Sequence, residues 1–249
     1  MKKFQFALMC AAVLALVACD KKPVNQPDEP NVDEPGVEDP IEDEYVSPIK
    51  VDDASLADWD NLPAEYVFSV ANVEGSSNDA LNKITVYADE VYINILVEYN
   101  TTHESIDKAE TPFHLYINAD NSAATGGFSA GQWITPDVDI LFEGLIFSEG
   151  AAVPYEPGMF AYAGAPGTDE WNWSELVPAA TPYASQWVGD KLEIQLLWEL
   201  IPVTFGDSFT IGADIQDTGW NSVGFLPNAA DDELGNTVLA EKMEVTFNK

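Results

Sequence analysis

Oxygen-bearing side chains crowd the segment INADNSAATGGF, residues 117–128. An apolar run ends at Ile117, and carboxylate, amide and hydroxyl oxygens follow it in Asn118, Asp120, Asn121, Ser122 and Thr125. A hard cation such as Ca²⁺ prefers about six to eight such oxygens, and Gly126–Gly127 lets the backbone fold tightly. The segment is not an EF-hand, because Ala124 and Gly131 stand at ligand positions of that loop. The same residue types build ordinary turns, so a calcium site and a plain turn both stay open.

Side chains for catalysis form no recognisable motif. The chain has two histidines, His103 and His114, and no Gly-x-Ser-x-Gly sequence. His103–Glu104 lacks the second His of a metalloprotease helix, so both His are expected to be surface or packing residues. A glycosidase needs two facing acids, but the chain has 43 Asp and Glu and the sequence cannot select a pair. We therefore expect no catalytic activity, with a glycan hydrolase as a minor alternative.

Several tryptophans have the chemistry to bind sugar, because a flat aromatic face packs against the CH side of a pyranose. Four of them lie among Gly, Asn, Asp and Pro and are candidates for exposed loops: Trp133, Trp171, Trp173 and Trp220. Trp171 and Trp173 share one face if their segment is extended. Capping of the ends of the fold is the alternative role. Trp59 and Trp198 are expected in the core.

The elements that must position these residues are short strands. Residues 82–100 predict two strands that meet at residues 88–90, because apolar and polar residues alternate through residues 91–99. In residues 113–117, His114 and Tyr116 face away from the apolar side.

Three further predictions complete the pattern of elements. Residues 139–147 predict a strand broken at Glu143–Gly144, and residues 183–198 predict a hairpin through Gly189–Asp190. Late strands are expected within residues 208–216 and 237–248, and only single helical turns near residues 53–59 and 198–202. Eight or more short strands predict an all-β sandwich of two antiparallel sheets in one domain.

The net charge of the chain restricts the classes of ligand that it can bind. Ten Lys, no Arg and 43 Asp and Glu give a formal net charge of −33. Nucleic acid is excluded as a partner because its phosphates need cationic contacts, and sulfated glycans normally need Arg or Lys. Neutral ligands and divalent cations are favoured. Most of these acids are interpreted as solubility charge.

The N-terminal part of the chain predicts export and lipid anchoring. Residues 1–18 combine Lys2–Lys3, an apolar stretch and Leu16-Val17-Ala18 before Cys19, which resembles the lipobox of a bacterial lipoprotein. Cys19 is thus the predicted lipidation site, and an ordinary secretory signal is the alternative. Residues 19–48 are rich in Pro, Asp and Glu and predict an extended tether. The sandwich domain is expected to span residues 49–249.

Ordered motifs in the folded part resemble the family 9-like carbohydrate-binding modules, β-sandwiches found in surface lipoproteins of Bacteroidota. These motifs are IKVDDASLADWDNLP (49–63), the 118–126 turn, DVDILFEG (137–144), DEWNWSEL (169–176) and GWNSVGFLP (219–227). The resemblance implies structural calcium at Asp120 and Asn121, with Asp137 or Asp139 as a partner. Asn118 departs from the family, which has Asp there, and this loses one negative charge. The resemblance also implies a jelly-roll-like form of the sandwich and aromatic side chains that clamp a sugar.

The expected function is a non-catalytic, lipid-anchored surface module that binds neutral glycan for an outer-membrane uptake complex. An adhesion or structural lipoprotein with a protein partner is the alternative. Asp20 after Cys19 retains some lipoproteins at the inner membrane. The acidic tether resembles the surface-export signals of Bacteroidota, so the outer membrane, facing the cell exterior, is the expected location.

Overall fold

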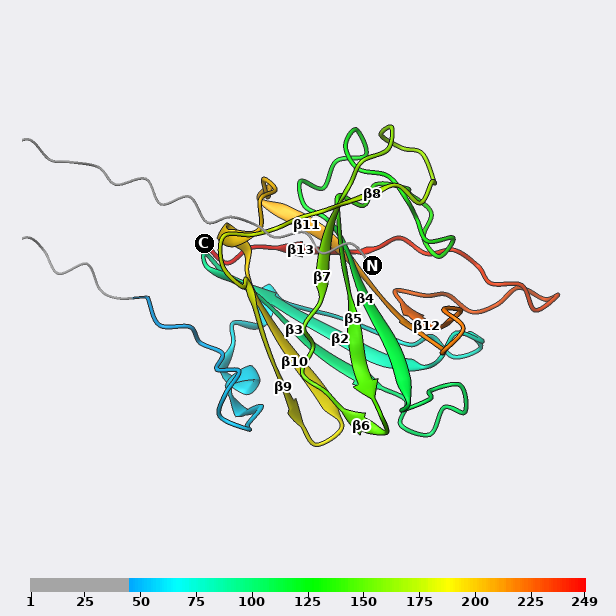
Figure 1. Cartoon of the computed structure of the whole chain (residues 1–249), viewed down its shortest axis with the longest axis horizontal. Helices are drawn as coiled ribbons and strands as arrows, with labels where there is room; N and C mark the ends of the chain where they lie inside the picture. The colour runs from blue at the N-terminus through cyan, green and yellow to red at the C-terminus, as the bar shows by residue number, and fades with distance from the viewer. Residues whose placement is uncertain (1–44) are drawn as a thin grey trace, which may run out of the picture. The chain divides into compact units, whose positions relative to one another are not determined.

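A computed structural model describes residues 45–249 (Figure 1). The predicted signal peptide of residues 1–18, the lipidation site Cys19 and all but the end of the predicted tether lie outside the described residues. Within residues 45–249, no helix is long and apolar enough to cross a membrane. The compact unit is Tyr45–Lys249. It includes Ser47, whose hydroxyl accepts a hydrogen bond from Gln195 (3.3 Å), so the folded part begins slightly before the expected residue 49.

Two antiparallel sheets form a β-sandwich, as predicted (Figure 1). The five-stranded sheet has the order β1 (Val67–Ala71), β2 (Leu81–Ala88), β3 (Tyr92–Tyr99), β10 (Lys191–Leu197) and β9 (Tyr183–Val188). The other sheet runs β12 (Ser222–Leu226), β11 (Ser208–Gln216), β4 (Glu110–Asn118), β5 (Ile140–Ser148), β7 (Gly158–Tyr162) and β8 (Trp173–Glu175). In addition, β13 (Met243–Thr246) pairs with β11, and β6 (Ala151–Ala152) pairs with β5. The short 3₁₀ turns are η1 (Ala57–Asn61), η2 (Ala64–Tyr66) and η3 (Trp198–Leu200).

Alternation along the strands places the core between the sheets. Phe113, Leu115 and Ile117 of β4 point inward, as the sequence predicted, and join the main core cluster. Ile93 and Ile95 of β3 face them from the other sheet and are likewise fully buried. The hairpin β9–β10 turns at Gly189, whose φ of 65° suits a residue without Cβ, and this confirms the predicted turn.

The predicted break at Glu143–Gly144 is wrong, because β5 runs unbroken from Ile140 to Ser148. The irregularity lies two residues further along β5: Thr111 pairs with Phe147 and Pro112 with Leu145, so Ile146 is an extra residue at that point. Pro112 has no backbone N–H to donate to the ladder. Gly144 has another role: a Cβ there would lie 3.0 Å from the ring of Tyr155, whose hydroxyl bonds to backbone carbonyls of β4 and β5. The late strand is also shorter than predicted, since β13 covers only Met243–Thr246.

The outer face of the five-stranded sheet is covered by the segment that precedes β1. Ile49 is buried there. The indole N–H of Trp59 donates to Glu193 Oε1 (2.6 Å), and Gln195 donates to the Ile49 carbonyl (3.2 Å). The Glu193 carboxylate, in the middle of the sheet, thus has protein hydrogen-bond donors as partners. The predicted binding residues, by contrast, lie on the strands and loops of the other sheet.

Candidate ligand-binding groove

Outward-pointing residues of the eight-stranded sheet bring most of the polar and aromatic chemistry together. His114 and Tyr116 of β4 point to this face, as predicted from the alternation. Register pairs them with Glu143 and Leu141 of β5, and pairs His114 with Asp214 of β11. A long connection between β4 and β5, residues 119–139, folds back over part of the face and forms a second hydrophobic cluster on it.

Trp133 lies inside that second cluster and is fully buried, so its predicted role as an exposed sugar-binding residue is wrong. The physical reason is Gly212 on β11, where a Cβ would lie 2.3 Å from the Trp133 ring. The missing side chain opens a slot for the indole, and its N–H donates to the Pro227 carbonyl (3.2 Å). Trp133 therefore anchors the 119–139 connection to the sheet.

An open groove of about 270 Å³ lies beside this connection, lined by Leu141, Glu143, Phe160, Trp171 and Trp173. Trp171 is 62% exposed, and Trp173 is partly buried. Their ring centroids are 6.0 Å apart with planes at 70°, so the two indoles form a corner and not a flat platform. The indole nitrogen of Trp173 is buried and has no hydrogen-bond partner within residues 45–249. Because this nitrogen is buried, a ligand in the groove would meet the ring of Trp173 and not its N–H.

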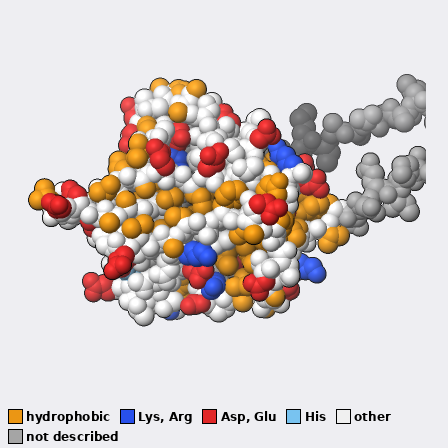
Figure 2. Space-filling model, turned by 180° about the vertical axis from the view of Figure 1, so that it is seen from behind, with side chains coloured by type: hydrophobic (Ala, Val, Ile, Leu, Met, Phe, Trp, Pro, Cys, Tyr) orange, Lys and Arg blue, Asp and Glu red, His pale blue; other side chains and the backbone are white. Residues whose placement is uncertain are grey.

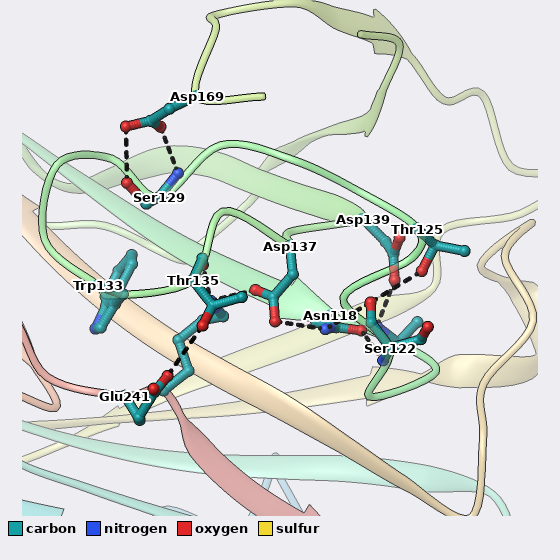
Figure 3. A network of polar contacts seen from close by, with 12 residues as sticks. Asn118, Ser122, Thr125, Ser129, Trp133, Thr135, Asp137, Asp139, Asp169 and Glu241 are labelled. Atoms are coloured by element: carbon teal, nitrogen blue, oxygen red, sulfur yellow. Dashed lines mark hydrogen bonds and ion pairs between the residues drawn. The ribbon is translucent and has the colours of Figure 1, made fainter. Parts of the chain in front are cut away.

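The two indoles are held by aromatic packing and by hydrogen bonds between two loops. Phe128 packs edge-on against both rings, at 5.3 Å from Trp171 and 5.7 Å from Trp173. Ser129 donates through its N–H and its hydroxyl to the Asp169 carboxylate (2.7 and 2.9 Å), which ties residues 119–139 to the segment before Trp171 (Figure 3). The corner is therefore set before any ligand arrives.

Trp220 is presented by a strained turn near the same face. It is 51% exposed and has φ of 63°, a region that bulky residues rarely adopt. Asp217 holds the turn by accepting the N–H groups of Gly219 (2.8 Å) and Asn221 (2.9 Å), and the Asn221 bond is the main reason that its pKa is lowered. The Trp220 ring lies 6.1 Å from His114.

His114 stands between two carboxylates beneath the groove. Its Nε2 lies 3.3 Å from Glu143 Oε2 and its Nδ1 lies 3.7 Å from Asp214 Oδ2, and neither nitrogen makes an aligned hydrogen bond. Burial disfavours the imidazolium and lowers the pKa of His114. The neighbouring carboxyl groups of Asp214 and Glu143 favour the imidazolium more strongly, so the pKa is raised above 6.5. Asp214 is fully buried and also accepts Ser222 Oγ (2.5 Å) and Gln216 Nε2 (2.7 Å).

The predicted calcium residues gather at the end of β4, but hydrogen bonds within the loop engage most of their oxygens (Figure 3). Asn118 Nδ2 donates to Asp137 Oδ2 (2.8 Å), and Asn118 Oδ1 accepts the Ser122 N–H (3.2 Å). The ammonium of Lys242 pairs with Asp137 Oδ1 and donates to the Thr135 carbonyl (2.9 Å). Asn121 points elsewhere, since its amide donates to Ser208 Oγ (3.0 Å) and Glu244 Oε1 (2.9 Å).

Asp120, Thr125 and Asp139 are the predicted ligands that remain. The Thr125 hydroxyl donates to Asp120 Oδ1 (2.9 Å), and Asp139 Oδ2 accepts the Ala119 N–H (2.8 Å). Burial raises the pKa of Asp139 from 3.8 to about 6, helped by the charges of Asp120 and Asp137 and opposed by the Ala119 N–H and Thr125. A cation bridging Asp120 and Asp139 would fit this excess of negative charge. Within residues 45–249, no three acidic, His or Cys side chains converge as a metal centre, so calcium stays a prediction at these residues.

Sequence reasoning missed the residues that complete the groove. Phe160 lies among apolar residues that mark no site, and Phe128 ends the polar segment 117–128 but was not itself predicted to contribute. Asp214 and Glu143 are two acids among many. The alternation that places His114 and Tyr116 on the outer face could have indicated which face carries the site. Gly212 within a strand could have indicated that a bulky side chain, that of Trp133, packs closely against the sheet there.

Comparison with protein-family models finds no match for the chain, and comparison with curated proteins finds no similar sequence. The resemblance to family 9-like modules therefore rests on the ordered motifs alone. The class that the structure defines is an antiparallel β-sandwich with an aromatic groove on one sheet.

Proposed function

We propose that this chain is a non-catalytic surface module that binds carbohydrate in the groove lined by Trp171, Trp173, Phe160, Leu141 and Glu143. The observation that carries the proposal is the rigid corner of two indoles beside one reachable carboxylate. Aromatic faces take up the CH side of a pyranose, and polar groups orient its hydroxyls. The partly exposed Glu143 carboxylate provides an acceptor for a ligand hydroxyl.

The charge of the protein limits the glycan to one without acidic groups. No Lys lines the groove. On the face drawn in Figure 2, acidic side chains and some lysines lie around an apolar band. An anionic sugar would meet repulsion with no cation to compensate for its desolvation. This electrostatic argument disfavours anionic glycans and is compatible with the neutral glycan that we propose.

The arrangement of acids favours binding over hydrolysis. A glycosidase places two accessible carboxyl groups on opposite sides of the scissile bond. Asp214 is fully buried and bonded to Ser222 and Gln216, so only Glu143 of this pair is reachable. We therefore propose no catalytic step here. Anchoring through a lipidated Cys19 at the outer membrane, facing outward and serving an uptake complex, remains part of the proposal.

Structural calcium enters the proposal only through Asp120, Asp139 and Thr125. A cation there would neutralise carboxylates that burial and mutual repulsion disfavour, and it would stiffen the connection that carries Phe128. The other predicted ligands already have protein partners.

The test is binding of the full chain to a panel of neutral oligosaccharides, measured by calorimetry and by indole fluorescence. We expect one class to bind and Trp171→Ala to weaken it about tenfold or more, as loss of a central aromatic contact does. Leu234→Ala is the matched control, because Leu234 is 87% exposed and lies outside the groove. If no glycan binds, or if both variants bind like the wild type, the groove is not a carbohydrate site.

A further inference from the structure

We propose that the preferred ligand of the groove is an amino sugar, a glycan whose protonated amine meets Glu143 between the aromatic side chains. This inference rests on the carbohydrate binding proposed above, and it replaces a neutral glycan with one that carries a protonated amine.

Glu143 is the only charged residue among the five that line the groove. Its side chain is 27% exposed, so a ligand atom can reach the carboxylate. Within residues 45–249, its one ion-pair partner is His114 Nε2 at 3.3 Å, and no protein group donates an aligned hydrogen bond to it. A carboxylate that retains free acceptor capacity in an aromatic recess favours a donor that carries positive charge.

His114 cannot neutralise this region, because it is shared. Glu143 and Asp214 both face the one imidazole, and the other groups on Asp214 are the neutral donors Ser222 and Gln216. Two carboxyl groups share one imidazole, so His114 cannot pair fully with both of them. Trp220, which packs near His114, adds no charge.

Within the described part of the chain, no lysine lines the groove beside Glu143. The chain has no Arg. Three of the Lys in residues 45–249 pair with acids elsewhere, namely Lys191 with Glu98, Lys242 with Asp137 and Lys249 with Asp207, and none lines the groove.

The walls of the groove suit the same ligand. Trp171, Trp173 and Phe160 offer ring faces and edges around Glu143, and aromatic faces attract an ammonium group. A neutral sugar would stack equally well but would offer Glu143 only a hydroxyl, whereas an ammonium forms a charge-assisted hydrogen bond. The groove should therefore prefer a glycan with an ammonium substituent over one that carries a hydroxyl at the same position.

The experiment compares three tetrasaccharides on the full chain by calorimetry: β-1,4-linked glucosamine, its N-acetylated form, and β-1,4-linked glucose. We expect the free amine to bind about tenfold more tightly than the other two, and the preference to weaken as salt rises. Glu143→Gln keeps the shape of the side chain and removes its charge, so it should abolish the preference. Glu175→Gln is the control, since Glu175 is exposed on β8 outside this groove.

The outcomes separate this inference from the proposed function. Equal affinity for the three sugars, or a preference that survives Glu143→Gln, overturns the amino-sugar inference and leaves carbohydrate binding in place. Absence of binding to any glycan overturns both. If Glu143→Gln does not fold, the wild-type chain alone still tests the inference. N-acetylation removes the positive charge from the ligand, just as the substitution removes the negative charge from the protein.

Discussion

Replacing Asp139 with Asn should stabilise the domain at neutral pH in the absence of metal. The folded state raises the pKa of this carboxyl from 3.8 to about 6, chiefly through burial. The stability it contributes is therefore complete below about pH 3.8 and is lost as the pH rises through about 6. Above that pH the fold holds a carboxylate that its surroundings disfavour. Asn remains neutral and can still accept the Ala119 N–H that now bonds Asp139 Oδ2 at 2.8 Å.

The magnitude follows from the size of the pKa change. A rise from 3.8 to about 6 corresponds to at most roughly 3 kcal/mol. Asp139 is only partly buried, so screening by solvent reduces the expected gain to about 1–2 kcal/mol. For a domain of this size, the melting temperature should rise by about 2–8 °C.

The assay is urea unfolding of wild type and Asp139→Asn, in EDTA, at about pH 4 and about pH 7.5. The variant should gain stability at the higher pH and gain little at the lower one. Asp60→Asn, an exposed carboxylate on η1, is the control and should change neither value. An equal change at both pH values, or a loss at pH 7.5, would refute the reasoning.

The same pair of proteins tests calcium at Asp120 and Asp139. If Ca²⁺ binds there, adding it after EDTA should raise the melting temperature of the wild type by mass action and leave Asp139→Asn unchanged. A wild type that does not respond contradicts the calcium proposal and makes residues 118–128 a turn held by its own hydrogen bonds.

Three further predictions concern the parts that support the groove. Gly212→Ala should cost about 1–3 kcal/mol in urea unfolding, because the added methyl meets the Trp133 ring; wild-type stability would mean that the indole moves freely. His114→Gln should reduce the loss of stability between pH 6 and 8, since the raised pKa of His114 stabilises the fold below about 6.5 and that gain fades at higher pH; parallel profiles would argue against its ion pairs. Lys242→Met should lower the free energy of unfolding by about 3–5 kcal/mol, because Asp137 loses its buried counter-charge, and adding Asp137→Asn should restore part of it; no recovery would show that the lysine acts through packing.

Alternation in the sequence was sufficient to predict the sandwich and the side of β4 that faces outward. Phe113, Leu115 and Ile117 are buried between the sheets and His114 and Tyr116 lie on the other face, because a strand turns successive side chains to opposite sides. The Gly189 turn was equally local, since two strands and a tight turn need only neighbouring residues.

Long-range packing decided the rest. Trp133 and Trp171 have similar polar neighbours in sequence, yet Trp133 is buried and Trp171 is 62% exposed. The difference arises from Gly212, far along the chain, which opens a slot under one indole and not the other. Likewise, the sequence predicts Asp137 as a calcium ligand, but in the fold its carboxylate pairs with the ammonium of Lys242, which is distant in sequence.

The sequence by itself therefore determined the class of fold and the pool of aromatic and acidic residues, because periodicity and composition are properties of neighbouring positions. Only the tertiary structure decided which of them meet. Glu143, Trp171 and Trp173 come together because β5, β7 and β8 are adjacent in one sheet, and that adjacency depends on pairing between distant segments.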